Sequence, residues 1–220
     1  SHAGHVEEVV THLCGKVVDV LIVPGMSGCP VGSVSAIAAG LPAIPLKKQK
    51  PNADPDALYP PGSFVIPSYT GDGDVVISAD HDAVVDILAT VLARRLAALP
   101  DDPHPVIEIR AAGADDIIDK ATMAHAITDS APLFCQAALD DAVALYRAES
   151  GDERPIEARV DVVSWVTPII KAYNGPDEHL EHHFGITPFA GIWVTSVHLD
   201  PCAIGVQGAG VLAFACSGAR

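Results

Sequence analysis

The sequence predicts an α/β fold built on a parallel sheet, with a smaller α+β appendage at the C-terminal end. Residues 17–50 run strand, helix, strand, and such a βαβ unit builds parallel sheets. A long amphipathic helix pattern and a further apolar strand follow before residue 150. Near residue 151 the composition changes to a connector rich in proline and charge. We therefore expect a core over residues 1–150 and an appendage over residues 151–220.

The first elements follow from periodicity and from glycine and proline positions. Residues 5–15 carry apolar side chains at helical spacing and stop at a glycine, which predicts an amphipathic helix. Residues 17–24 are almost wholly apolar and β-branched, as in a buried strand. Residues 29–40 read as a helix with Pro30 in its first turn, where a missing N–H costs nothing. Residues 41–46 form a second short strand.

The remaining elements are predicted in the same way. Residues 47–62 are rich in Pro, Asp and Asn and predict a loop. Residues 63–78 predict a hairpin turning at TGDGD, and residues 80–99 predict a helix with acidic residues first and arginines last. We expect a strand at 104–110, a loop running into a helix at 111–127, and a separate helix at 136–150. The appendage contains strand-like runs at 158–166, 191–199 and 210–216 and one short helix at 177–185.

Composition limits the classes of function. The chain has 220 residues, of which 49% are hydrophobic and 19% charged, so it can bury a sizeable core. A formal net charge of −15 argues against nucleic-acid binding, which needs clustered Lys and Arg. No apolar run is long enough to span a bilayer and no leader opens the chain, so we expect no membrane partner and a cytoplasmic location. The five scattered cysteines predict reduced, mostly buried thiols.

The junction PGMSGCPVG is the first candidate binding element. Gly25, Gly28 and Gly32 lie where a strand meets a helix, and a helix N-terminus offers unpaired N–H groups to an anion. Lys47 and Lys48 follow the adjacent strand, at the carboxyl edge where open α/β sheets bind ligands. Together these residues predict a phosphate or pyrophosphate site. The alternatives are a tight packing turn and a solvated surface run of lysines.

These features resemble the type I phosphoribosyltransferases, and most closely their adenine phosphoribosyltransferase-like branch. The predicted fold is then a parallel-sheet phosphoribosyltransferase-like core with the appendage as a possible hood. The resemblance implies that Ser27, Gly28 and Cys29 lie in a pyrophosphate-binding loop with Gly25, and that Lys47 or Lys48 supplies the cation. It implies that residues 50–62 form a lid over the site.

The family's second signature is an apolar strand ending in two acids, followed by a Thr- and Gly-rich phosphate loop that opens a helix. The stretch DDIIDKAT is similar to it: Asp115 and Asp116 would hold the ribose and Mg²⁺, with Asp119 close by and Thr122 opening the helix. The chain departs from the pattern where Lys120 and Ala121 replace the usual glycines, and where RAAGA rather than a clean apolar strand precedes the acids. The positive charge of Lys120 would compensate for the loss of the close backbone contact with a phosphate that the glycines allow. The alternative is a solvated, dipole-stabilised helix start.

The resemblance implies Mg²⁺-dependent transfer of a ribosyl group from phosphoribosyl diphosphate to a nucleobase-like nitrogen base, with release of pyrophosphate. We also expect a homo-oligomer. One alternative is a catalytically silent module of the same fold that binds a sugar phosphate or nucleotide. A second alternative is a metal- or Cys-dependent lyase or hydrolase, in which His179 and His183 share a metal or Cys202 pairs with His198. The competing interpretation of the two histidines is a solvated polar face of a helix. The competing interpretation of Cys202 is a β-turn between buried strands.

Overall fold

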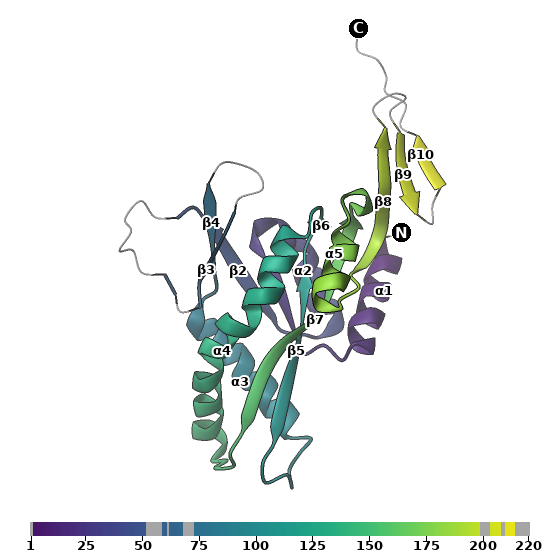
Figure 1. The fold of residues 1–220 in the computed structure, drawn as a ribbon. Coiled ribbons are helices and arrows are strands. Elements are labelled where there is room, and N and C mark those ends of the chain that lie inside the picture. The colour runs from purple at the N-terminus through teal and green to yellow at the C-terminus, as the bar shows by residue number, and fades with distance from the viewer. Residues whose placement is uncertain are drawn as a thin grey trace.

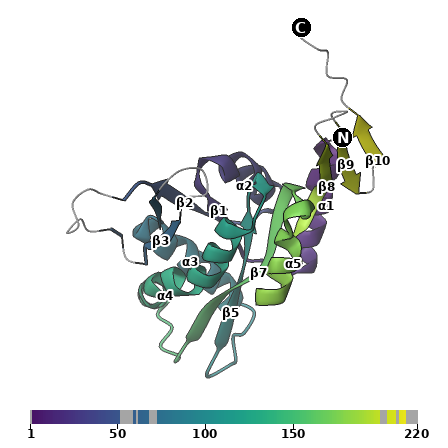
Figure 2. The same ribbon diagram turned by 45° about the horizontal axis from the view of Figure 1, so that its top comes forward.

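The computed structural model describes residues 2–51, 59–60, 62–67, 73–198, 203–207 and 210–213. It is a mixed α/β structure in which helices cover both faces of a twisted central sheet, as the sequence predicts (Figures 1 and 2). The strands are β1 (Val20–Pro24), β2 (Ala43–Gln49), β3 (Phe64–Pro67), β4 (Asp74–Ser78), β5 (Val106–Ala114), β6 (Ile117–Ile118), β7 (Glu157–Ile170), β8 (Phe189–His198), β9 (Ala203–Gln207) and β10 (Gly210–Ala213). The helices are α1 (His2–Gly15), α2 (Gly25–Ala39), α3 (His81–Leu96), α4 (Thr122–Ser150), the 3₁₀ turn η1 (Ala172–Asn174) and α5 (Pro176–Phe184).

The sheet has a parallel centre and antiparallel edges. Its strand order is β10-β9-β8-β7-β5-β1-β2-β4-β3, and β6 pairs with β7 beside this path. Strands β2, β1, β5, β7 and β8 run parallel to one another, whereas β4 and β3 close one edge and β9 and β10 the other in antiparallel pairs. The carboxyl ends of the parallel strands therefore meet at one edge of the sheet, where ligands of open α/β sheets bind.

Two apolar layers hold the helices on the sheet. On one face, α1 and α2 pack against Leu21 and Val23 of β1. On the other face, α3 and α4 cover Val20 and Ile22, and α5 adds Leu180, which is fully buried. Strand β1 alternates its side chains between these two layers, and for this reason its sequence is apolar at every position. The result is a three-layer α/β/α arrangement (Figure 2).

The structure corrects two sequence-based expectations about the core and confirms a third. RAAGA does not interrupt the third strand, because β5 continues to Ala114 and its last four residues are buried. The helices expected at 111–127 and 136–150 are one helix, α4, with Pro132 inside it. Buried side chains on both sides of that proline, including Ala131 and Cys135, pack into the core and keep the helix continuous. The hairpin expected at 63–78 is confirmed by the pairing of β3 with β4; residues 68–72, which include its turn, lie outside the described residues.

The end of β5 is positioned by close packing on β7. A methyl group at Gly113 would lie 2.4 Å from the Trp165 ring, so only glycine lets this ring lie against the strand. The indole N–H of Trp165 donates to Thr128 Oγ1 on α4 at 2.9 Å. Trp165 therefore connects three elements, because its ring packs on β5, it belongs to β7, and its N–H bonds to α4. The connection lies next to the carboxyl end of β5.

The sheet runs without a break across residue 150. Strand β7 pairs with β5 along its length, from Val106 beside Glu157 to Ala114 beside Val166. The expected boundary between residues 150 and 151 thus falls before a central strand, and the two-part division stays a prediction. Figure 1 shows β8, β9 and β10 extending beyond the body of the molecule near the C-terminal end. No helix in the described part of the chain has the length and apolar character needed to cross a bilayer.

Candidate functional site

An acidic pair lies at the carboxyl end of β5. Asp115 follows the strand directly, and its N–H donates to the carbonyl oxygen of Val166 at 3.1 Å, which ties it to β7. Its own Oδ1 accepts the N–H of Asp116 at 2.9 Å. Because RAAGA belongs to β5, the two acids end an apolar, buried strand. This is the arrangement that the resemblance implies.

The Asp115 carboxyl is held in an unusual protonation state. Burial raises its pKa to about 7, and the hydrogen bond and the charge of neighbouring Asp116 act in the same direction. The N–H of Asp116 and the positive charge of Lys48 oppose the change without cancelling it. A carboxyl near this value gains or loses a proton around neutral pH. A perturbed acid of this kind at a sheet edge is typical of a functional site.

The Gly-rich junction after β1 also lies against Asp115. It forms the first turn of a helix and not a loop. Helix α2 begins at Gly25, directly after β1, and Gly25 has a left-handed φ of 59°. A methyl group at Gly28 would lie 2.9 Å from the Ala114 carbonyl oxygen and 3.3 Å from Asp115 Oδ1. Glycine at this position lets the first turn of α2 lie directly on the acidic pair.

Helix α2 has no side-chain cap at its N-terminus, so its first N–H groups have no partner from the residue that precedes it. The lysines lie in the second half of β2 and not after it, because β4 pairs there, with Lys48 opposite Ile77. A methyl group at Gly25 would contact Cβ of Lys48 at 3.8 Å. The N-terminus of α2 therefore lies beside both Lys48 and Asp115.

A cavity of about 220 Å³ opens beside Asp115 at the start of α4. Its lining comes from the segment between β5 and the first turn of α4, without Asp116, and from one residue after β7: Asp115, Ile117, Ile118, Asp119, Lys120, Ala121, Thr122, Met123, Ala124 and Lys171. No side chain caps the N-terminus of α4, so the first N–H groups of this helix are available to an anion. Three predicted residues, Asp119, Lys120 and Thr122, line this cavity together with Asp115.

Ala121 has a backbone conformation that is unusual for a residue other than glycine. Its φ of 57° lies in the left-handed region, which glycine favours and alanine adopts at a cost of about 1 kcal/mol. The N–H of His125 then donates to the Ala121 carbonyl oxygen at 2.6 Å and starts the helix. The backbone thus keeps a glycine-like turn at this position, while the Ala121 methyl group is buried against the core.

The sequence did not point to Lys171, which lines the cavity, or to Asn174, which bonds to Asp119 of its wall. Lys171 follows β7 and donates to Asp119 Oδ2 at 2.9 Å, and the Asn174 side-chain amide donates to Asp119 Oδ1. Burial acts to raise the pKa of Asp119, but these two hydrogen bonds and the charge of Lys171 outweigh it and leave the pKa low. The available signal was the position of Lys171, a basic residue at the carboxyl end of a parallel strand.

The other predicted residues stand apart from the cavity. Cys29 donates its thiol hydrogen to the Gly25 carbonyl oxygen within α2 at 3.1 Å. Lys47 is exposed on β2 opposite Ser78. Most of the expected lid at 50–62 lies outside the described residues, as does the Ser27 side chain. Cys14 is exposed, Cys29 is half-buried and Cys135 is buried; all three are free thiols.

The acidic pair suits Mg²⁺. This ion prefers oxygen ligands and is held in proteins by one or two carboxylates together with substrate phosphates. Asp115 and Asp116 supply such a pair, and a cation would stabilise the ionised form of Asp115, whose pKa is raised by burial and by the neighbouring Asp116. Within the described ranges, no group of three or more His, Cys, Asp and Glu side chains is arranged to hold a metal ion by itself. The structure therefore does not identify His179 and His183 as metal ligands, and that alternative stays a prediction; Cys202 lies outside the described residues.

Comparison with known proteins gives a fold and no sequence family. No family model matches the sequence. No curated protein matches it either. Among solved structures, the adenine phosphoribosyltransferase of Giardia lamblia, complexed with 9-deazaadenine, is similar with a TM-score of 0.50 at 11% identity, over 88% of this chain and 78% of the enzyme. The chain has a type I phosphoribosyltransferase-like fold.

Two bacterial adenine phosphoribosyltransferases are similar at a lower level. The enzyme from Thermoanaerobacter pseudethanolicus has a TM-score of 0.47 at 12% identity, over 86% of this chain and 77% of its own. The enzyme from Rhodothermus marinus has the same TM-score and coverage at 11% identity. At such identities the likeness concerns the phosphoribosyltransferase-like fold alone, and the chemistry has to be argued from the residues of this chain.

Proposed function

We propose that this chain binds phosphoribosyl diphosphate with Mg²⁺ and transfers the ribosyl group to a nitrogen base, releasing pyrophosphate. The observation that carries the proposal is the meeting of three elements at Asp115: the acidic end of β5, the uncapped N-terminus of α2 with Lys48, and the cavity at the uncapped N-terminus of α4. Each of the two helix termini suits one phosphoryl group, and the acids between them suit a ribose.

The proposed roles follow from charge and position. The carboxylates of Asp115 and Asp116 accept hydrogen bonds from the ribose hydroxyls. The N–H groups at the start of α4, with Lys120 and Thr122, hold the 5′-phosphate. The α2 N-terminus and Lys48 stabilise the charge that develops on departing pyrophosphate. When bound, Mg²⁺ supplies further positive charge to the pyrophosphate. Catalysis here is mainly positioning and electrostatic stabilisation.

Calorimetric titration with phosphoribosyl diphosphate and Mg²⁺ tests the binding part of the proposal. We expect micromolar binding to the wild type and at least a tenfold loss in the Asp115→Ala/Asp116→Ala variant. Asp140→Ala, an exposed carboxylate farther along α4, is the matched control and should bind like the wild type. Circular dichroism of each variant checks that it is folded. Absence of binding to the folded wild type would refute the proposal.

The second candidate is a silent module that binds the sugar phosphate without turnover. It is favoured by the left-handed Ala121 in place of a loop glycine and by the Asp119 carboxylate, which Lys171 and Asn174 already engage. An assay of pyrophosphate release distinguishes the transferase from the silent module. Adenine is the first base to test, because the similar Giardia structure holds an adenine analogue. Binding without release over a panel of bases would favour the silent module. The homo-oligomer, the lid and the cytoplasmic location remain part of the proposal.

A further inference from the structure

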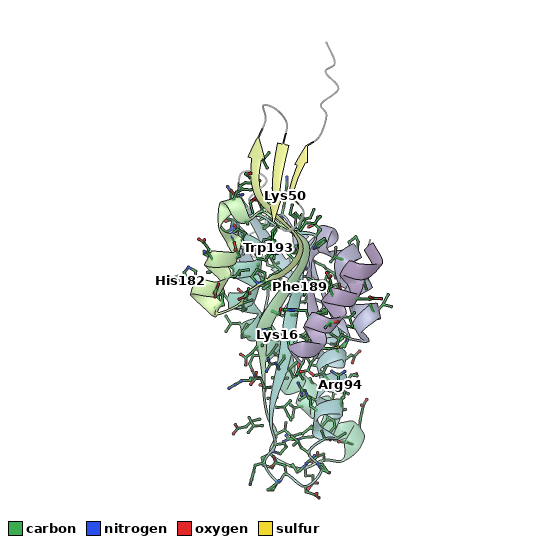
Figure 3. The ribbon with its side chains drawn as sticks, turned by 90° about the vertical axis from the view of Figure 1, so that its right-hand side faces the viewer. Lys16, Lys50, Arg94, His182, Phe189 and Trp193 are labelled. Atoms are coloured by element: carbon green, nitrogen blue, oxygen red, sulfur yellow. The ribbon has the colours of Figure 1, made fainter. Side chains whose placement is uncertain are left out.

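Four histidines gather where α5 meets the first turns of α4. His125 Nδ1 and His179 Nε2 lie 2.7 Å apart and share a hydrogen bond. The ring centroid of His183 is 4.4 Å from that of His179 and 5.4 Å from that of His125. His182 extends the group, with its ring centroid 5.0 Å from that of His183. In Figure 3 His182 lies on the outer side of α5, away from the sheet.

The hydrogen bond between two imidazoles depends on their protonation. One ring nitrogen has to donate and the other has to offer a lone pair, so at least one ring must be neutral. If both rings are protonated, all their nitrogens carry hydrogen, and two N–H groups then point at each other across 2.7 Å. The bond therefore requires at least one neutral ring and is lost when both rings are protonated.

The surrounding charges strengthen this dependence. Burial lowers the pKa of His179, and His183, His125 and His182 lower it further. The other ionisable side chains next to these histidines in the sequence, and on the segment before α5, do not contribute to this change: Asp129 on α4, Lys171 after β7, and Asp177, Glu178 and Glu181 on α5. Because the folded state lowers this pKa below the ordinary value of 6.5, the unfolded segment binds more protons in acid. The contact between the helices therefore loses stability as the pH falls below about 6.5.

The cluster lies next to the cavity. His125 is one turn into α4, and its N–H bonds to Ala121 of the cavity wall. Helix α5 directly follows η1 and Gly175, and the same segment brings Lys171 and Asn174 onto Asp119. Apolar contacts also hold α5: Leu180 is fully buried, and the Phe184 ring lies edge-on to His125 at 4.9 Å. Loss of the histidine contact would therefore loosen α5 without detaching it.

The arrangement favours a proton over a metal ion as the ligand of this cluster. Ring nitrogens that share a tetrahedral zinc ion at about 2.0–2.1 Å are held about 3.3 Å apart. In this structure the facing nitrogens of His125 and His179 lie 2.7 Å apart and bond directly to each other. In the described parts of the chain, no group of three such side chains is arranged for a metal.

We propose that the cluster of His125, His179, His182 and His183 is a pH-sensitive latch: neutral, it fastens α5 and the segment 171–175 to the first turn of α4, and protonated, it loosens their contact with α4. The loosened segment carries both hydrogen-bond partners of Asp119. The latch thus couples the state of the cavity wall to pH, and its operation does not depend on which ligand the cavity binds.

Amide hydrogen exchange at pH 7.5 and pH 5.5, corrected for intrinsic exchange rates and followed in the presence of a chelator, tests the latch. In the wild type, protection of residues 171–184 should fall at least tenfold at pH 5.5, whereas α3 should keep its protection. The His125→Asn/His179→Gln variant should respond less than threefold. Its two amides reproduce the positions of Nδ1 and Nε2 and can hydrogen-bond to each other without titrating.

His104→Gln, in the exposed loop before β5 and outside the cluster, is the matched control and should respond like the wild type. If the double variant fails to fold, His183→Gln takes its place, because removal of one neighbouring charge should reduce the pH response several-fold. Equal protection of 171–184 in the wild type at both pH values would overturn the latch. So would a pH response as large as that of the wild type in the folded His125→Asn/His179→Gln or His183→Gln variant.

Discussion

Replacement of Asp115 by asparagine is expected to stabilise the fold at neutral and alkaline pH. The buried carboxyl keeps its proton up to a pKa of about 7, whereas the ordinary value is 3.8. Between these two values the folded protein binds a proton that the unfolded chain has lost, so the free energy of unfolding falls as the pH rises. Asparagine carries no such charge and keeps an oxygen that can accept the Asp116 N–H.

The magnitude follows from the two pKa values. Their difference is about 3 pH units, and at 1.36 kcal/mol for each unit the full penalty has an upper limit of about 4 kcal/mol. Partial solvation and the positive charge of Lys48 reduce the effective cost of a buried charge, so we expect Asp115→Asn to gain about 2 kcal/mol at pH 8. The gain should be smaller at pH 5, by at least about 1 kcal/mol.

Urea unfolding of the wild type and Asp115→Asn at pH 5, 6, 7 and 8 measures this gain. Asp140→Asn, which removes an exposed carboxylate from α4, should show a nearly constant difference from the wild type. A gain of Asp115→Asn that is the same at every pH, or a loss of stability at pH 8, would refute the reasoning. Weaker binding of phosphoribosyl diphosphate by the stabilised variant would indicate that the charge is kept for function.

Three further variants test the packing and the turn. Gly113→Ala should lower the free energy of unfolding by about 2 kcal/mol or more, because its methyl group would overlap the Trp165 ring, while Gly15→Ala, with open space around it, should be nearly neutral in the same urea titration. Asp19→Ala should lower the free energy of unfolding by about 3 kcal/mol in the same titration. The reason is that two arginines of α3 lose the buried carboxylate to which they bond at 2.7 and 3.2 Å. A decrease below about 1 kcal/mol would contradict this. Ala121→Gly keeps the left-handed turn, relieves the cost of an alanine in that region and lets the turn adjust to a bound phosphate, so calorimetry should give several-fold tighter binding of phosphoribosyl diphosphate. Unchanged or weaker binding would argue against a phosphate at this turn.

Small residues account for the main errors in the predicted core. Alanine and glycine have low strand propensity, so RAAGA reads as a loop, yet these residues are needed where Trp165 packs against β5. Pro132 reads as a helix break, yet buried side chains on both sides of it keep α4 in one piece. In both places tertiary packing overrides the local conformational preference of the residues. A sequence pattern reports only that local preference.

The sequence by itself determined the α/β class, the order of the first strands and helices, and the residue types of the candidate site. Apolar runs, helical spacing and turn residues are local properties, and Asp115, Asp116, Lys120 and Thr122 are contiguous enough to be recognised together. Only the tertiary structure decided that Lys48 and the start of α2 reach Asp115 and that Lys171 closes on Asp119. It also brought His125 against His179. Contacts between residues far apart in the chain depend on how the sheet and helices pack, and no local pattern encodes them.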